Sequence, residues 1–377
     1  MKKNYLMTPG PTPVPPEVLL EMARPLIHHR TPQYQEILKK VNEGLKKVFK
    51  TKYDVMTFTS SGTGAMEASV VNLLSPGDKA VVVRGGKFGE RFGEIMTSYG
   101  MEVIPIDVTW GKPVDPKSIK AALDKNKDAK AVYTTLCETS TGTMNDIRAV
   151  GEVVKNYDAA LVVDAVSGLG ADDLDTDAWG VDVALSGSQK GLMLPPGLAF
   201  ISFSDKAWKL VEKSKAPKFY FDVKKYKKSL EKTDTPFTSA ITLFIGLERS
   251  LAIILAEGMG AVLARHRKLA DATRRAMQAL GLELYSSSPS DAVTAVHVPA
   301  GIDGGALVKT ARDTYGVTMA GGQAELKGKI FRIAHLGFME NFDVIVAVSC
   351  VEIVLKGMGF KIELGKGVRA AEEALLK

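Results

Sequence analysis

The sequence predicts an α/β protein with a large domain, built on a mostly parallel sheet that helices cover, and a smaller C-terminal α+β domain. Three observations support this prediction. Short apolar runs alternate with segments long enough for helices, the 377 residues exceed what one core usually organises, and the pattern changes near residue 258. We therefore expect an N-terminal arm over residues 1–16, a large domain over 17–257 and a small domain over 258–377.

The N-terminal segment contains five prolines between residues 9 and 16, together with Gly10. Proline lacks a backbone N–H and disfavours a helix interior, so the segment is expected to be extended and to lie on another surface. Arms of this kind often cross to a partner subunit.

The large domain is predicted from apolar runs of strand length. They lie at residues 54–58, 80–83, 131–134, 161–164, 181–184 and 198–201. Most are separated by enough residues for a crossover helix, which favours parallel pairing; the last connections are shorter.

The remaining elements are assigned by the same patterns. Residues 235–265 are predicted to form one long apolar helix. The small domain then has strands around residues 293–298 and 330–333 and amphipathic helices over 342–355 and 365–376. The boundary between the large and the small domain is placed to within roughly ten residues.

Composition narrows the classes of protein. The net charge of +6 is a small excess, and the basic run at residues 224–228 is typical of a solvated helix face, so nucleic acid is not an expected partner. No metal site is expected either. No apolar stretch has the length of a signal peptide or membrane span. The two cysteines are too few for a disulfide framework, and we expect a cytoplasmic protein without membrane contact.

Lys190 follows a predicted strand inside the small-residue turn Ser186-Gly187-Ser188-Gln189-Lys190-Gly191. A partly desolvated lysine has a lowered pKa and can react with an aldehyde, although an exposed lysine is the commoner case. Asp164 ends an apolar strand and needs a cation, such as a protonated pyridine nitrogen, or it caps the next turn.

A candidate phosphate site lies between residues 59 and 68, where a strand leads into a helix-forming sequence. Backbone amides and the hydroxyls of Ser61 and Thr63 can approach an anion at the helix N-terminus. No lysine closes this turn, so it is not a Walker loop, and ordinary helix capping uses the same residues.

Three further side chains suit a planar cofactor and its substrate. Phe88 could stack on an aromatic ring, and Thr139 could donate a hydrogen bond to a ring hydroxyl. Arg332, in a short apolar strand, could bind a carboxylate with both arms of its guanidinium group. Core packing, a simple turn and a structural salt bridge, respectively, are the alternatives.

Taken in order, these segments resemble the class V aminotransferases of the fold-type I pyridoxal 5′-phosphate (PLP) superfamily, and most of all the alanine–glyoxylate and serine–glyoxylate aminotransferases. The resemblance runs almost from end to end. It rests on Thr8-Pro9-Gly10-Pro11-Thr12, Ser61-Gly62-Thr63, Glu138-Thr139-Ser140-Thr141-Gly142, Val163-Asp164-Ala165-Val166-Ser167, Ser186-Gly187-Ser188-Gln189-Lys190, Pro195-Pro196-Gly197, Thr235-Pro236-Phe237-Thr238 and Phe331-Arg332-Ile333-Ala334-His335-Leu336-Gly337.

The resemblance implies a seven-stranded type of sheet and a role for each site residue. Lys190 would hold PLP as a Schiff base, Asp164 would contact its pyridine nitrogen, Thr139 would lie near the ring hydroxyl, and Arg332 would bind the substrate carboxylate. Ser61, Gly62, Thr63 and Gln189 would hold the phosphate, and Thr235 and Thr238 would reach the phosphate of a neighbouring subunit in a homodimer. Phe88 stands where the most similar family members often have a tryptophan, and Thr63 stands where some have a histidine.

The expected function is therefore PLP-dependent transamination between a small amino acid, alanine or serine, and a keto acid, with glyoxylate first. One alternative is a lyase or cysteine desulfurase of the same fold, which needs a reactive cysteine on a mobile loop; residues 321–327 contain none. The other is a non-catalytic subunit that has kept the fold. The segment His28-His29-Arg30 has no assigned role.

Overall fold

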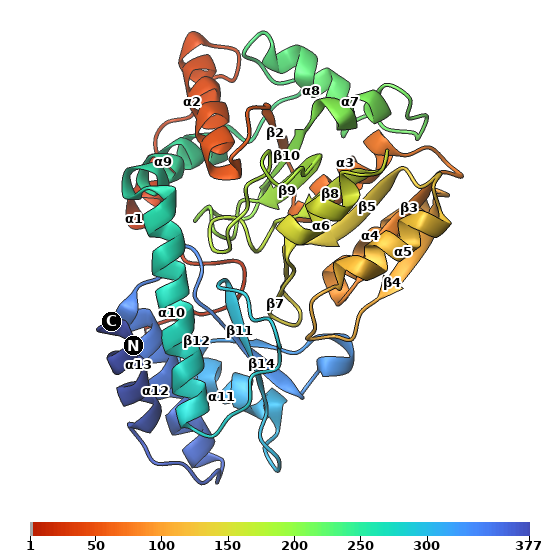
Figure 1. Ribbon diagram of the computed structural model, residues 1–377. Helices are drawn as coiled ribbons and strands as arrows, with labels where there is room; N and C mark the ends of the chain where they lie inside the picture. The colour runs from red at the N-terminus through yellow and green to blue at the C-terminus, as the bar shows by residue number, and fades with distance from the viewer. Residues whose placement is uncertain (1–2) are drawn as a thin grey trace.

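The computed structural model describes residues 3–377 and is built around a seven-stranded sheet (Figure 1). The strand order is β2-β10-β9-β8-β5-β3-β4, and within this sheet β10 runs in the opposite direction to the other six strands. The strands span β2 Val55–Thr59, β10 Leu198–Phe203, β9 Val183–Gly187, β8 Ala160–Asp164, β5 Ala131–Thr135, β3 Lys79–Arg84 and β4 Glu102–Asp107. The predicted mostly parallel α/β fold is confirmed.

The inner strands are apolar because both faces of the sheet are covered. Every residue of β5, β8 and β9 is buried. The alternation of side chains divides them between two cores, so that Val81 and Val83 face one side while Val82 faces the other.

Helices of the large sheet fall into two groups, one on each core. The first core includes side chains of α2 (Pro32–Phe49), α5 (Pro116–Lys125), α6 (Ile147–Val154) and α9 (Ile241–Glu257). The second includes those of α3 (Gly62–Leu73), α4 (Lys87–Ser98), α7 (Asp205–Val211) and α8 (Val223–Leu230). Placement of helices on both faces was also predicted.

The single helix predicted for residues 235–265 is wrong. The segment forms α9, which ends at Glu257, and then α10 (Met259–Ala279), with Gly258 between them at φ +85°. That left-handed conformation suits glycine and breaks the helix. As a result α9 packs on α2, whereas α10 packs mainly on α13 (Lys366–Leu375).

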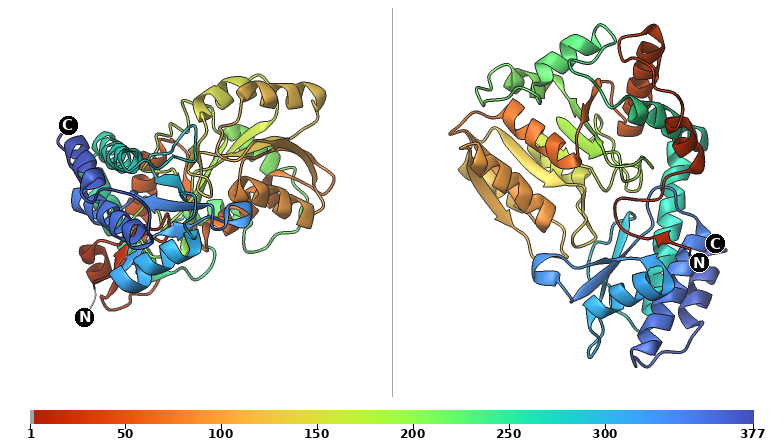
Figure 2. Two further views of the ribbon diagram at one scale, coloured as in Figure 1. Left: turned by 90° about the horizontal axis from the view of Figure 1, so that it is seen from below. Right: turned by 180° about the vertical axis from the view of Figure 1, so that it is seen from behind.

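The C-terminal part has its own small sheet and a third core (Figures 1 and 2). Strands β11 (Val293–His297), β14 (Ile330–Ala334) and β13 (Ala320–Gly321) pair antiparallel. They pack with α10, α11 (Gly304–Tyr315) and α12 (Asn341–Gly357). The short elements β6 (Cys137–Glu138), β7 (Thr143–Met144), β12 (Val317–Thr318) and η1 (Ala324–Leu326) complete the chain.

The N-terminal arm is extended and lies on the C-terminal part of its own chain (Figure 2). Strand β1 (Tyr5–Leu6) pairs parallel with β12, and the carbonyl of Met7 accepts a hydrogen bond of 2.9 Å from the N–H of Ala334. The arm then passes the loop that contains Lys190 and enters α1 (Pro16–Met22), which packs on α9.

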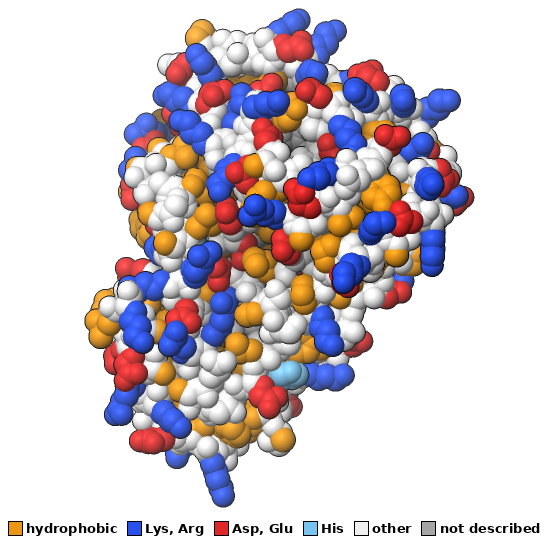
Figure 3. Space-filling model, in the orientation of Figure 1, with side chains coloured by type: hydrophobic (Ala, Val, Ile, Leu, Met, Phe, Trp, Pro, Cys, Tyr) orange, Lys and Arg blue, Asp and Glu red, His pale blue; other side chains and the backbone are white. Residues whose placement is uncertain are grey.

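The molecular surface in Figure 3 has Lys and Arg side chains interspersed with Asp and Glu side chains. Within residues 3–377, no helix combines the length and the apolar character that crossing a membrane requires.

Candidate active site

One cavity of about 220 Å³ brings together most of the residues singled out in the sequence. It lies where the loops after β8 and β9 meet the start of α3, at the carboxyl-terminal ends of parallel strands. The predicted residues in its wall are Ser61, Gly62, Thr63, Phe88, Asp164, Gln189 and Lys190. Gly10, Pro11, Met66, Arg91, Val166 and Pro196 complete the lining.

Lys190 is held firmly in this cavity, with 8% of its surface exposed. Its amine donates a hydrogen bond to the carbonyl oxygen of Pro9, and its own carbonyl accepts one of 3.0 Å from the hydroxyl of Thr12. Burial lowers the pKa of the amine to about 8. A lysine with this pKa has an appreciable neutral fraction near neutral pH and can attack an aldehyde.

Asp164, at the end of β8, is 4% exposed, and burial raises the pKa of its carboxyl group to about 6. Its Oδ1 atom accepts a hydrogen bond of 2.8 Å from the N–H of Val166, as the turn-capping alternative predicts. That bond uses one oxygen, and the other has no hydrogen bond to any residue from 3 to 377. A cationic partner in the cavity would therefore stabilise the carboxylate.

The turn before α3 leaves several donors free. Ser61 occupies the N-cap position, but its side chain makes no capping hydrogen bond. In the described chain, no carbonyl or side chain accepts from the N–H groups of Gly62 and Thr63. At Gly62 an added Cβ would lie 2.8 Å from Val166 Cγ2, so only glycine fits there. These free donors at a helix N-terminus suit an anionic ligand.

Gln189 adds an unsatisfied polar group to the same cavity. Its Oε1 atom is buried and has no hydrogen-bond partner. The two ends of a glutamine amide are assigned from their partners, so the same side chain turned over presents an N–H donor. A phosphate group would satisfy it.

Phe88 lies in the first turn of α4 and is fixed through its backbone. The buried carboxylate of Glu138 accepts hydrogen bonds from the N–H groups of Phe88, at 3.1 Å, and Gly89, at 2.9 Å. The hydroxyl of Ser140 donates to the same carboxylate at 2.6 Å. Desolvation raises the pKa of Glu138 above its usual range.

Sequence reasoning missed Arg91, Glu138, Gly10 and Pro11 as parts of this site. Arg91 had a usable signal, because it follows Phe88 by three residues and thus shares its face of a helix. Its guanidinium carbon lies 4.9 Å from the centre of the Phe88 ring. Gly10 and Pro11 reach the cavity through the path of the arm, which no local pattern reveals.

Arg332 and Thr139 lie together beside the cavity rather than in its lining. Arg332 is 4% exposed, and its Nη1 donates to the carbonyl of Thr139 at 2.7 Å. Its Nε and Nη2 donate to the carbonyl of Gly321 at 3.1 and 2.7 Å. The hydroxyl of Thr139 bonds to that of Ser167.

The charge of Arg332 is not neutralised by an ion pair with any carboxylate from residue 3 onward. Burial lowers the pKa of its guanidinium to about 10, while nearby Glu138 raises it. Backbone carbonyls therefore orient the fork of donors, and the salt-bridge alternative does not describe this arginine. A buried, unpaired cation of this geometry suits a carboxylate ligand.

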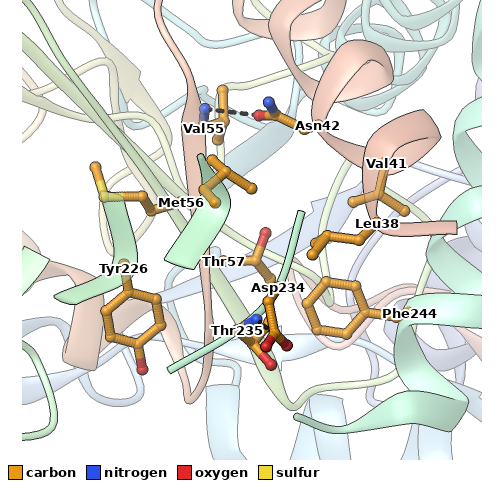
Figure 4. Close-up of a pocket in the computed structure, with 11 residues that line it drawn as sticks. Leu38, Val41, Asn42, Val55, Met56, Thr57, Tyr226, Asp234, Thr235 and Phe244 are labelled. Atoms are coloured by element: carbon orange, nitrogen blue, oxygen red, sulfur yellow. Dashed lines mark hydrogen bonds between the residues drawn. The ribbon is translucent and has the colours of Figure 1, made fainter. Parts of the chain in front are cut away.

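Thr235 and Thr238 do not line the cavity that contains Lys190. Figure 4 shows Thr235 in a separate cavity of about 20 Å³, between residues of α2, β2 and α9 such as Leu38, Met56 and Phe244. Thr238 is exposed. The role predicted for these two threonines requires a second subunit, so it stays a prediction.

The residues present fit PLP. The cavity offers an amine of lowered pKa, a buried carboxylate, an aromatic ring and an anion-binding turn with an unsatisfied amide nearby. The cysteines fit the desulfurase alternative poorly, because Cys137 and Cys350 are buried and burial raises the pKa of both thiols.

Comparison with known proteins agrees with this geometry. The family model "Aminotransferase class-V" matches residues 4–334. A protein named as the small subunit of a soluble hydrogenase, from Synechococcus sp., is 45% identical over 99% of this chain and 98% of its own length. A serine–glyoxylate aminotransferase from Hyphomicrobium methylovorum is 38% identical over 99% of this chain and 95% of its own.

Among solved structures, the ureidoglycine–glyoxylate aminotransferase of Bacillus subtilis superposes with a TM-score of 0.96 at 30% identity, covering 100% of this chain and 99% of the other. The family match, the full-length identities and the cavity around Lys190 lead to one assignment. The chain belongs to the class V aminotransferase family, and the family and its named relatives identify it as a PLP-dependent aminotransferase.

Proposed function

We propose that this enzyme transfers the amino group of a small amino acid, alanine or serine, to a keto acid, with glyoxylate as the leading acceptor. The observation that carries the proposal is the meeting of Lys190, Asp164 and the Ser61–Thr63 turn in one cavity. The two named aminotransferases above both have glyoxylate in their names and differ in the amino donor. The shared word therefore supports glyoxylate as the amino acceptor, whereas the amino donor is less well supported.

We further propose which residues hold the cofactor. Ser61, Gly62, Thr63 and Gln189 bind its phosphate, and Phe88 packs against its ring. Thr139 contacts the ring hydroxyl, and Asp164 keeps the pyridine nitrogen protonated. PLP bound in this way supplies an electron sink for the bonds of the substrate α-carbon.

Lys190 is proposed to move the proton of the reaction. Its amine, with a pKa lowered to about 8 by burial, suits a base that would take a proton from the substrate α-carbon and then deliver it to the former aldehyde carbon of the cofactor. Asp164 and the arm carbonyl of Pro9 flank this amine, so it stays inside the cavity when it is free.

Arg332 is proposed to bind the substrate carboxylate. The carbonyls of Thr139 and Gly321 fix the plane of its guanidinium group, and the absence of an ion pair within residues 3–377 leaves its charge for a ligand. Because Thr139 is bonded to Arg332, the cofactor-side and substrate-side contacts are mechanically connected.

We also propose that the enzyme works in the cytoplasm as a homodimer, in which Thr235 and Thr238 contact the phosphate of the neighbouring subunit. The exposure of Thr238 is compatible with this role. We place the domain boundary at Gly258, where α9 gives way to α10, and the arm at residues 1–16.

The deciding experiment is an absorbance titration of the purified protein reconstituted with PLP. Alanine or serine should bleach the visible band of the bound cofactor, and glyoxylate should restore it. The K190A variant should lack that band and turnover, whereas the exposed Lys228 changed to alanine should leave both intact. A K190A variant with the band and full turnover would refute the role of Lys190.

A second candidate, a non-catalytic subunit, is kept because of the relative that is named as a hydrogenase subunit. It predicts that no amino acid bleaches the cofactor band. A desulfurase would instead release sulfide from cysteine, and the same cuvette assay with cysteine as the donor separates it from a transaminase.

A further inference from the structure

The phosphate turn described above lacks a positive charge of its own. Ser61, Gly62 and Thr63 offer hydroxyl and amide donors, and the start of α3 adds about half an elementary charge. A phosphate monoester carries about −1.5 to −2 charges at neutral pH. The turn has no lysine, in contrast to a Walker loop, so the missing charge has to come from another part of the fold.

The charged side chains that line the described cavity are Arg91, Asp164 and Lys190. Under the proposed function, Asp164 pairs with the pyridine nitrogen and Lys190 is bonded to the cofactor. Arg91 is then the lining cation that has no assigned partner. Among residues 3–377, no carboxylate forms an ion pair with it.

Arg91 is also in the right place. Its Nη1 atom donates a hydrogen bond of 3.1 Å to Oγ1 of Thr63, a residue of the phosphate turn. It projects from α4, an element separate from the turn, and α3 and α4 pack against each other. The guanidinium group is therefore within one hydrogen bond of the atoms that would surround the phosphate.

We propose that Arg91 is an additional cofactor-binding residue that neutralises the phosphate of PLP from α4. The inference rests on the proposed function, since it takes the Ser61–Thr63 turn as the phosphate site. The contact between Arg91 and Phe88 offers a competing explanation, in which Arg91 acts only by holding the ring of Phe88 in position.

The two explanations predict different responses to pyridoxal, which lacks the phosphate. We would measure the dissociation constants of PLP and of pyridoxal by quenching of protein fluorescence in the wild type and in R91Q, R91K and F88L. The matched control is K87Q, since Lys87 is a cation of the same helix turn that pairs with Glu90 at 2.6 Å and does not line the cavity.

The expected result is that R91Q weakens PLP binding on the order of 10- to 100-fold and changes pyridoxal binding by less than about 2-fold. R91K should lie between R91Q and the wild type, because it keeps the charge but loses the planar fork. F88L should weaken both ligands alike, and K87Q neither. Urea unfolding of the apo variants checks that each is folded. If R91Q does not fold, the comparison of PLP with pyridoxal is made with R91K instead.

Two results would overturn the inference while leaving the proposed function intact. In one, R91Q binds PLP as tightly as the wild type does. In the other, R91Q weakens the binding of PLP and of pyridoxal equally, which would mean that Arg91 acts only by positioning the ring of Phe88. If the wild type itself binds neither ligand, the proposed function fails and the inference fails with it.

Discussion

Asp164 gives a prediction in which stability and function oppose each other. In the apo protein, burial raises the pKa of this carboxyl group from 3.8 to about 6, so its charged form is disfavoured in the fold. Between these two pH values the folded protein holds a proton that the unfolded chain has released. Its stability therefore falls as the pH rises through that window. The cost works out at about 1.5 kcal/mol at pH 5 and about 3 kcal/mol at pH 7.5.

The D164N variant cannot ionise and keeps an oxygen that accepts the hydrogen bond from Val166. We expect apo D164N to be more stable than the apo wild type, with a difference that grows by about 1.5 kcal/mol from pH 5 to pH 7.5. The assay is urea unfolding of both apo proteins, followed by intrinsic fluorescence at the two pH values. The exposed Asp158, changed to asparagine, is the control and should show no such growth.

With PLP present the order should reverse, because the carboxylate then gains a cationic partner that asparagine cannot replace. A stability difference that stays constant with pH would refute the claim that the charge of Asp164 is desolvated. A PLP affinity that D164N leaves unchanged would refute its pairing with the pyridine nitrogen.

Three further changes test the site. R332K should raise the KM for the amino donor on the order of 10- to 100-fold in steady-state assays with kcat changed much less, since lysine loses the fork that Thr139 and Gly321 orient; an unchanged KM would place the substrate carboxylate elsewhere. G10A puts a Cβ 2.4 Å from Lys190 Cε and should weaken PLP binding at least about 10-fold. The control is G281A, because Gly281 also has a positive φ but has open space around it. It should cost about 1–2 kcal/mol of unfolding free energy and leave PLP binding unchanged. E138A leaves the N–H groups of Phe88 and Gly89 without their acceptor and should cost about 2–4 kcal/mol in urea unfolding, against no measurable loss for the exposed Glu152 changed to alanine.

The parts of the fold that follow from local patterns were predicted well. The buried strands were recognised because they are continuous apolar runs, and Lys190 and Asp164 because they follow such runs. Strand β4 was missed, since it is an edge strand with charged ends and contains Pro105, which an edge tolerates. The helix over residues 235–265 was predicted as one piece because its composition is mostly apolar on both sides of Gly258, where the positive φ angle divides it.

The residues of the candidate site were predicted only where they belong to a local sequence motif. Residues within a strand-end motif were found, whereas Gly10 and Arg91 enter the cavity from elements that are remote from Lys190 in the sequence. Their positions depend on how the arm crosses the C-terminal part and on how α4 packs beside α3. Tertiary packing, rather than any periodicity, decides both.

The arm also sets an order of assembly. Residues 5–12 are made well before the residues that they contact: Thr12 bonds to Lys190, Tyr5 pairs with Val317, and Met7 accepts from Ala334. Sequence separations this large are expensive to close early in folding. The wall that the arm gives to the cavity is therefore held in place only once residues as far along the chain as Ala334 have been made and folded.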